Sequence, residues 1–368
     1  MVLRVALDGE PLLGRRTGVG KFVEGLLSAL AGRPGLDLGV FAVTWRMRPE
    51  LERQLPPGSH LIGRPMPARP LRRAWEAGLD VPAEWFTGRL DVLHGTNSIV
   101  PPARRAARVV TVHDLSPLRY PEVCEPATLA YPDFIRRAVA GGAFVHTDSE
   151  FVAAEVREAF GAPSARVRAI HPGIPPLVEG GRAPELPFPR YILSIGTVEP
   201  RKDYPGLLRA FDDLAGRHRD VGLVIVGADA WGASEFAEAL SASPHRDRVV
   251  RPGYLSDAAL GALLRAATVL AYPSRYEGFG FPPLQAMAAG VPVVATAGGS
   301  IPEVVGDAAV VVPVGDSEAL AGALERVLDD RDHAEHLGLA GRERAARFTW
   351  EALGHAMVGL YEEAVQSM

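Results

Sequence analysis

Short apolar runs rich in Val and Ile recur along the whole chain, and longer segments with helical spacing separate them. This alternation is typical of parallel strands joined by crossover helices. Helices are predicted over residues 20–30, 127–139 and 149–160. In the first half the predicted strands are LRVALD, LGVFAV, LDVLHG, RVVTVHD and AFVHTDS; in the second half they are RYILSIG, VGLVIVG, TVLAYPS, GVPVVAT and AAVVVPV. The pattern predicts an α/β protein with two doubly wound parallel sheets.

The periodicity disappears in a stretch between these halves that is rich in Pro and Gly, which is the composition of an interdomain linker. We therefore predict a Rossmann-like domain over residues 1–171, a linker over 172–189 and a second Rossmann-like domain over 190–348. Residues 349–368 are expected to form a C-terminal helix that packs back toward the first domain. A length of 368 residues fits two domains of ordinary size.

Composition excludes several classes of function. A net charge of -5 argues against general affinity for nucleic acid. The single cysteine, Cys124, rules out an internal disulfide and a cysteine-based zinc site. The N-terminus is unlike a signal peptide, and no apolar run reaches the length of a membrane span. We expect a cytoplasmic protein, with peripheral contact to the inner face of the membrane as an alternative.

Ligands of doubly wound sheets bind beyond the carboxyl ends of the strands, so site residues are expected directly after strands. After the first strand, Gly18 and Gly20 permit a phosphate to approach the start of a helix, although an ordinary tight connection is an equally good interpretation. His113 ends another strand, where it could hydrogen-bond a sugar hydroxyl or an oxyanion. A structural pair of His113 with Asp114 is the alternative.

Two loops of the second half contain further candidates. After RYILSIG, Arg201 and Lys202 stand beside the start of a helix, and adjacent cations there suit a diphosphate. The chain has only two lysines, Lys21 and Lys202, so a lysine at this place is notable. A solvated Arg-Lys pair is the alternative.

The second loop follows TVLAYPS and is rich in glycine. Gly278 and Gly280 let the backbone approach a ligand beside Glu277 and Phe279, and the next helix directs its amides there. Gln285 lies one turn into that helix, near enough to hydrogen-bond a ribose. Spacing alone does not identify the ligand.

Together these two loops resemble the signature of the retaining glycosyltransferases of family 4, which have the GT-B fold. The G-x-x-x-P-R-K motif runs from Gly196 to Lys202, and the family's paired acidic positions fall on Glu277 and Gln285. TGVGKF, VHDLSPL, HPGI and GGSIPEVVGDAAVVVP extend the resemblance over nearly the whole chain, and the mannosyltransferase-like subgroup is the most similar. The resemblance implies two Rossmann-like domains facing across a cleft.

The resemblance also implies roles for the candidate residues of the second half. Arg201 and Lys202 would bind the donor diphosphate, with Gly196 beginning their motif. Glu277 would contact the donor sugar, and the loop from Gly278 to Gly280 would help to neutralise the diphosphate. The family has a second Glu for the ribose hydroxyls where this chain has Gln285, which offers one neutral carbonyl oxygen instead of a carboxylate. Weaker ribose binding is a possible result.

In the first half, Gly18 would lie near the diphosphate or the acceptor, and His113 would hydrogen-bond the transferred sugar. The implied enzyme needs no cofactor and no metal. It moves a hexose from a nucleoside-diphosphate sugar to a saccharide, lipid-linked or small-molecule acceptor, with retention of configuration. Mannose from GDP-mannose is favoured, and UDP- or dTDP-sugars are alternatives.

Other functions remain open at this stage. A degenerate GT-B protein that only binds nucleotide sugars is one alternative, supported by the Gln285 departure, and a nucleotide-sugar epimerase of the same fold is another. An NAD-dependent dehydrogenase is disfavoured because neither half has the full glycine fingerprint. The arginine-rich residues 64–75 could touch a membrane or a polyprenyl-diphosphate acceptor, but a solvated junction between a loop and a helix is the better interpretation.

Overall fold

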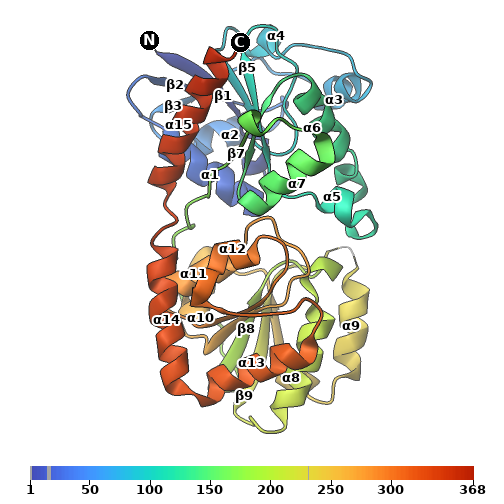
Figure 1. The fold of residues 1–368 in the computed structure, drawn as a ribbon, viewed down its shortest axis with the longest axis vertical. Coiled ribbons are helices and arrows are strands. Elements are labelled where there is room, and N and C mark those ends of the chain that lie inside the picture. Colours follow the sequence, from blue (N-terminus) through green and yellow to red (C-terminus); the bar gives the residue numbers. More distant parts are fainter. Residues whose placement is uncertain (1, 15–17, 231) are drawn as a thin grey trace. The chain divides into compact units, whose positions relative to one another are not determined.

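The computed structural model describes residues 2–14, 18–230 and 232–368. The chain divides into two compact units, and each is described here by itself (Figure 1). The first unit consists of Met1–Arg119, Pro126–Gly173 and Phe348–Met368, and the second of Tyr120–Glu125 and Ile174–Arg347.

The sheet of the first unit is parallel throughout its described pairs and has the order β3-β2-β1-β4-β5-β6-β7. The strand order reverses between β1 and β4, which makes the sheet doubly wound, as predicted. Its central strands are largely buried because helices cover both faces. The strands are β1 (Leu3–Asp8), β2 (Leu36–Phe41), β3 (Ser59–Leu61), β4 (Val92–Gly95), β5 (Ala107–Val112), β6 (Phe144–Thr147) and β7 (Val167–Ala169).

Local sequence signals set the helix ends of this unit. Ser149 caps α7 by accepting a hydrogen bond from the Val152 amide, as its position predicts. The helix predicted over 127–139 instead begins at Tyr131, because Pro132 has no N–H to donate and is tolerated only in a first turn. The helices are α1 (Gly18–Leu30), α2 (Arg48–Gln54), α3 (Ala68–Glu76), α4 (Glu84–Thr87), α5 (Ser116–Arg119), α6 (Tyr131–Ala140), α7 (Glu150–Phe160) and α15 (Trp350–Gln366).

The C-terminal helix α15 packs within the first unit, beside α1 and against β4 and β5 (Figure 1). Its buried side chains include Leu353, Met357 and Tyr361. The face formed by α3, α6 and α7 has a separate apolar cluster that includes Trp75, Ile135 and Val156. Both faces of the sheet are therefore covered by helices.

The second unit repeats the topology of the first with the order β10-β9-β8-β11-β12-β13, so its strand order reverses between β8 and β11. Asp330 caps α14 by accepting from the His333 amide, which explains the Asp330-Arg331-Asp332 triplet as a helix start. None of the described helices has the length and apolar character needed to cross a membrane. The strands are β8 (Arg190–Ile195), β9 (Val221–Val226), β10 (Val249–Gly253), β11 (Val269–Tyr272), β12 (Val293–Thr296) and β13 (Val310–Val312). The helices are α8 (Tyr204–Ala215), α9 (Ala233–Ala242), α10 (Asp257–Arg265), α11 (Phe281–Ala289), α12 (Ile301–Val305), α13 (Ser317–Asp329) and α14 (Arg331–Ala345).

Candidate active site

The strand order of the second unit brings two of the predicted loops together. β8 and β11 are neighbours in the sheet although two strands, β9 and β10, lie between them along the chain, and both run in the same direction. The loops that follow them therefore leave the same edge of the sheet at the point where the order reverses. Ligands of open α/β sheets bind at such a point.

Arg201 and Lys202 lie in the first of these loops, in a short 3-10 turn (Pro200–Lys202) that precedes α8. Asp203 follows with a positive φ of 48° and caps α8 by accepting from the Gly206 amide at 3.3 Å. The same carboxylate accepts from Arg275 of the second loop at 3.1 Å. Asp203 thus fixes both the start of the helix and the position of the neighbouring loop.

Glu277 of the second loop contacts both cations. Its Oε1 accepts from Lys202 Nζ at 2.5 Å, and its Oε2 accepts from Arg201 at 2.8 Å. Arg201 also donates to the Tyr276 carbonyl at 2.7 Å and to Glu199 at 2.6 Å. In this arrangement two cations are balanced by two carboxylates.

Burial makes this cluster electrostatically strong, since Lys202 is only 8% exposed and Glu277 only 6%. Burial alone would raise the pKa of Glu277, but the charges of Arg201 and Lys202 outweigh it and lower that pKa to about 2. Burial lowers the pKa of Lys202, and Glu277 opposes this shift. Glu277 is therefore a firmly ionised carboxylate and a weak base.

Tyr272, at the end of β11, completes the surroundings of Lys202. The ammonium donates to the Tyr272 hydroxyl at 3.1 Å and lies 5.1 Å from the centre of its ring. Burial raises the pKa of Tyr272 well above its ordinary value, so the hydroxyl stays protonated. An ammonium has three N–H donors, and the described residues accept from two of those of Lys202.

Gly196, which begins the cation motif, directly follows β8 and accepts from the Tyr204 hydroxyl through its carbonyl at 2.9 Å. Gly280 precedes α11 with φ of 112°, a conformation that requires glycine. Gly278 and Phe279 lie in the same loop, and Ser300 donates to the Phe279 carbonyl at 3.1 Å. The sequence predicts amides at the start of this helix, but two of its first three residues are Pro282 and Pro283, which have none.

Gln285 lies in α11, as predicted, and its Nε2 donates to the Pro175 carbonyl at 3.3 Å. A glutamate at this position would place a second acceptor against that carbonyl. The amide thus has a structural partner in the chain, and its Oε1 is the atom that can accept from a ribose hydroxyl.

In the first unit, His113 directly follows β5 and both of its ring nitrogens have partners. Nδ1 lies 2.6 Å from Asp148 Oδ2, and Nε2 lies 2.9 Å from the Thr96 carbonyl. A carbonyl only accepts, so His113 donates through Nε2 and, with an ionised Asp148, through Nδ1 as well. Burial lowers the pKa of His113 but Asp148 outweighs it, and the pKa is raised. For His113 to contact a sugar hydroxyl, the hydroxyl must replace one of these two partners.

Gly18 and Gly20 lie in the first turn of α1. Thr17, which begins the TGVGKF motif, lies outside the described residues. Within the first unit, the end of β1 is joined to the loop after β4, because Thr96 Oγ1 donates at 2.7 Å to the carbonyl of Asp8, the last residue of β1. The contact lies at the switch point of this sheet.

Among the described residues, His218, Glu325 and Asp329 have the spacing of a possible metal site. However, both oxygens of Glu325 accept from Arg217, at 2.5 Å and 3.0 Å. The Arg217 guanidinium uses both oxygens of this carboxylate, and its positive charge repels a metal ion. His218, Glu325 and Asp329 are therefore better described as part of an ion-pair network.

The sequence indicated the two loops but missed several residues that hold them in place. Tyr272 looks like an ordinary strand residue, and Glu199 and Asp203 flank the cation pair without a motif of their own. The only available signal was proximity to strand ends, because contacts between loops depend on the strand order.

Comparisons with known proteins match both halves of the chain. The family model described as Glycosyltransferase Family 4 matches residues 16–176, and the model described as Glycosyl transferases group 1 matches residues 184–344. The O-antigen chain mannosyltransferase B of Escherichia coli is 30% identical over 286 residues, which cover 74% of each chain. The MMP alpha-(1->4)-mannosyltransferase of Mycolicibacterium hassiacum is 43% identical over 115 residues, 30% of this chain and 28% of that protein.

Among solved structures, Anabaena HepE in complex with UDP and glucose is similar over 97% of this chain and 98% of its own. The TM-score is 0.72 and the identity 18%, so the likeness shows the fold. With the family models and the Escherichia coli relative, it confirms the predicted GT-B architecture and enzyme class. The chain belongs to the family 4 glycosyltransferases, enzymes of GT-B fold that use nucleotide-sugar donors, and it is similar to the mannosyltransferases among them.

Proposed function

We propose that the enzyme transfers mannose from GDP-mannose to a saccharide, lipid-linked or small-molecule acceptor with retention of configuration. The observation that carries the proposal is the cluster of Arg201, Lys202 and Glu277 at the switch point of the second sheet. Mannose is supported by the mannosyltransferases among the relatives. The UDP in HepE makes a uridine donor the main alternative.

Arg201 and Lys202 bind the donor diphosphate in this proposal. Glu277 and Glu199 balance the two cations before the donor arrives. The diphosphate brings additional negative charge, and the third N–H of Lys202 is suited to one of its oxygens. As the anomeric bond breaks, charge develops on the departing diphosphate, and cations that are already in place stabilise it without reorganising.

Glu277 positions the donor sugar. Each of its oxygens accepts one bond from a cation, and a carboxylate oxygen has a further lone pair for a sugar hydroxyl. A pKa of about 2 makes Glu277 a poor general base. The departing diphosphate then takes the acceptor proton on the same face of the sugar, which gives retention.

The two remaining predicted contacts have constraints of their own. Gln285 accepts from a ribose hydroxyl through Oε1 while its Nε2 remains on the Pro175 carbonyl. His113 reaches the transferred sugar through Nε2, and the sugar hydroxyl replaces the Thr96 carbonyl as its acceptor. Gly18 and Gly20 allow the acceptor or the diphosphate to approach the first turn of α1.

A thermal-shift panel of GDP, UDP and dTDP with their sugars tests the proposal. A ligand that binds only the folded state at one hundred times its dissociation constant adds about 2.7 kcal/mol, which corresponds to roughly 3–4 °C for a chain of this length. We expect this shift with GDP and GDP-mannose for the wild type and its loss in Lys202→Met, which keeps the buried methylene stem.

Arg209→Ala is the matched control, because this exposed arginine lies on α8 in the same unit. It should shift like the wild type. Stabilisation by UDP alone would reassign the donor base. No shift with any nucleotide, or an equal shift in Lys202→Met, would refute the proposed diphosphate site.

A further inference from the structure

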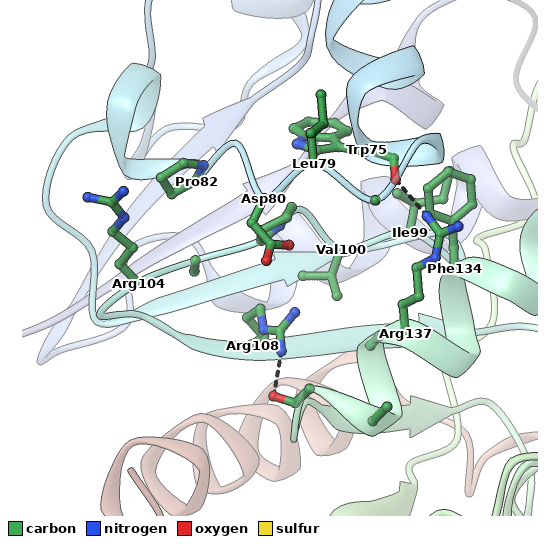
Figure 2. Close-up of a pocket in the computed structure, with 16 residues that line it drawn as sticks. Trp75, Leu79, Asp80, Pro82, Ile99, Val100, Arg104, Arg108, Phe134 and Arg137 are labelled. Carbon is green, nitrogen blue, oxygen red and sulfur yellow. Dashed lines mark hydrogen bonds between the residues drawn. The ribbon is translucent and has the colours of Figure 1, made fainter.

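The first unit contains a pocket of about 690 Å³ that the proposed reaction does not use (Figure 2). It lies between the segment after α3, the connection from β4 to β5, and α6. Arg108, at the start of β5, lines it, whereas His113 follows the end of the same strand. Five residues of strand separate them by roughly 16 Å. The pocket therefore lies at the amino-terminal end of β5, whereas His113 lies at the carboxyl-terminal end.

The walls of the pocket combine apolar side chains with positive charge. Trp75, Val100 and Phe134 are among the apolar ones. Among the described residues that line the pocket, three are arginines and a single one, Asp80, has a carboxylate; Figure 2 shows the arginine side chains at its sides and base. The volume is that of a small-molecule site. The arginines are Arg104, Arg108 and Arg137.

Arg108 is the most enclosed of these cations. It donates to the Gly141 carbonyl at 2.5 Å, and no carboxylate of the described residues comes within 4.0 Å of it. Burial lowers the pKa of Arg108, with Asp80 opposing this shift from a greater distance. A guanidinium has five N–H donors in a planar fork that matches phosphate oxygens. Arg108 therefore lacks a close counter-ion, which an external anion can supply.

The surface around the pocket has the same mixed character. Leu79, which lines it, is 60% exposed, and the nearby Trp85 is 64% exposed with Arg104 at 5.7 Å from its ring. In contrast, α3 buries its apolar side chains Leu71 and Trp75 in the core. Leu79 and Trp85 therefore place exposed apolar surface beside the pocket.

We propose that this pocket binds an anionic amphiphile, a phosphate ester of an alkyl chain. The phosphate pairs with Arg108 and the adjacent arginines, and the chain contacts Trp75 and Phe134. Several guanidinium groups around one space favour an anion with several oxygens over a single carboxylate. This chemistry is shared by phospholipid headgroups and by soluble alkyl phosphates.

Calorimetric titration with octyl phosphate tests the site, with inorganic phosphate and octanol as the two partial probes. We expect octyl phosphate to bind the wild type more tightly than either partial probe. Arg108→Gln keeps a donor for the Gly141 carbonyl but removes the charge, and should weaken binding about tenfold or more. Ala103→Phe should weaken it by filling the pocket.

Arg166→Gln is the matched control, because Arg166 similarly donates to the neighbouring Gly142 carbonyl but does not line the pocket. It should bind octyl phosphate like the wild type. Absence of binding, equal binding of inorganic phosphate or octanol, or equal loss in Arg166→Gln would overturn the proposal.

Vesicle pelleting then distinguishes the two sources of the phosphate. Phosphatidylglycerol vesicles that pellet the wild type but not Arg108→Gln, with phosphatidylcholine as the neutral control, would assign a lipid headgroup. Binding of octyl phosphate without pelleting would assign a soluble phosphate ester. Pelleting that Arg108→Gln leaves unchanged, without octyl phosphate binding, would place the membrane contact elsewhere and refute the pocket.

Discussion

At the scale of single residues, Glu277 holds two cations that would otherwise repel each other. Lys202 and Arg201 both donate to its carboxylate in a largely buried setting. Removing one partner of a buried ion pair is costly, because the remaining charge is left without compensation. Glu277 thus contributes to stability as well as to the proposed contact with the sugar.

This balance makes a prediction for Glu277→Gln. We expect the variant to lose roughly 3 kcal/mol of unfolding free energy, because two cations remain with Glu199 alone. GDP should then stabilise the variant by more than it stabilises the wild type, because the diphosphate restores the missing negative charge. Thermal melts with and without GDP measure both effects.

Glu199→Gln serves as the comparison, because among the described residues the ion pair of Glu199 is with Arg201, at 2.6 Å, and not with both cations. Its loss should be smaller, and its GDP shift should be close to that of the wild type. If GDP stabilises Glu277→Gln less than the wild type, Glu277 does not balance the cations that bind the diphosphate.

Gln285 shows how a departure from a family motif can have a local reason. Its Nε2 is a hydrogen-bond donor to the Pro175 carbonyl, a role that a carboxylate cannot fill. Pro175 belongs to the stretch predicted as a linker. With Gln285 in place of the family's Glu, the chain loses a charged acceptor for the ribose and gains a hydrogen bond between α11 and that stretch.

At the scale of elements, the contact of α1 with α15 depends on a glycine. A Cβ atom on Gly25 of α1 would lie 2.3 Å from the ring of Trp350, the first residue of α15. The two helices approach closely here because the ring lies against backbone. The C-terminal helix is thereby fixed to the first unit.

Gly25→Ala should therefore destabilise the protein by about 1–3 kcal/mol, the usual cost of an overpacked core, although alanine favours helices. Gly359→Ala is the control, because a Cβ on this glycine of α15 meets nothing within 4 Å. That variant should be neutral or more stable. Urea unfolding of both measures the difference, and equal stabilisation by both substitutions would contradict the proposed close contact.

The fold could be predicted from sequence where the elements are buried. All six residues of β9 are buried, and such continuous apolar runs predict central strands. The sequence pattern did not indicate β3, β7 or β10, because the first two have three residues each and β10 is only partly buried. The equally short edge strand β13 could be predicted because it consists of three valines, whereas β3, β7 and β10 lack such an apolar run.

The candidate site could be predicted only as loops. Arg201, Lys202 and Glu277 follow strands, and this much is visible in the sequence. Their mutual contacts required the neighbouring positions of β8 and β11, which are distant in sequence. The pocket at Arg108 depends on several separate segments and left no sequence signal.

At the scale of the whole molecule, a hydrogen-bonded chain of side chains links α15 to the first sheet. Tyr361 contacts His94 Nδ1, His94 Nε2 contacts Thr111, and Thr111 contacts His146 Nδ1. The chain ends at the Ile170 carbonyl, which only accepts, from His146 Nε2. When both histidines are neutral, Thr111 therefore donates to His146 and accepts from His94, and Tyr361 donates to His94. All four bonds can form in this neutral state.

The buried histidines have opposite effects on the pH dependence of stability. Burial lowers the pKa of His94 well below 6.5, with the charges of His146 and His113 adding to it. Burial also lowers the pKa of His146, although Asp148 opposes it. Both therefore stabilise the fold above pH 6.5, and this contribution is lost as the pH falls below that value. The pKa of His113 is raised, so its contribution is present below 6.5 and is lost as the pH rises through the folded-state pKa.

We therefore expect the unfolding free energy to be greatest near pH 6.5, with an acid branch of about 1 kcal/mol per pH unit for each of His94 and His146. Glu277 does not contribute to the change of stability between pH 5 and 6.5, because its ordinary pKa is 4.5 and its pKa in the folded protein is about 2. Urea unfolding across pH 5–8 measures the curve. His94→Gln should reduce the acid slope, whereas His355→Gln, on the exposed face of α15, should leave it unchanged. Equal acid slopes in the wild type and His94→Gln would show that His94 does not resist protonation in the folded protein.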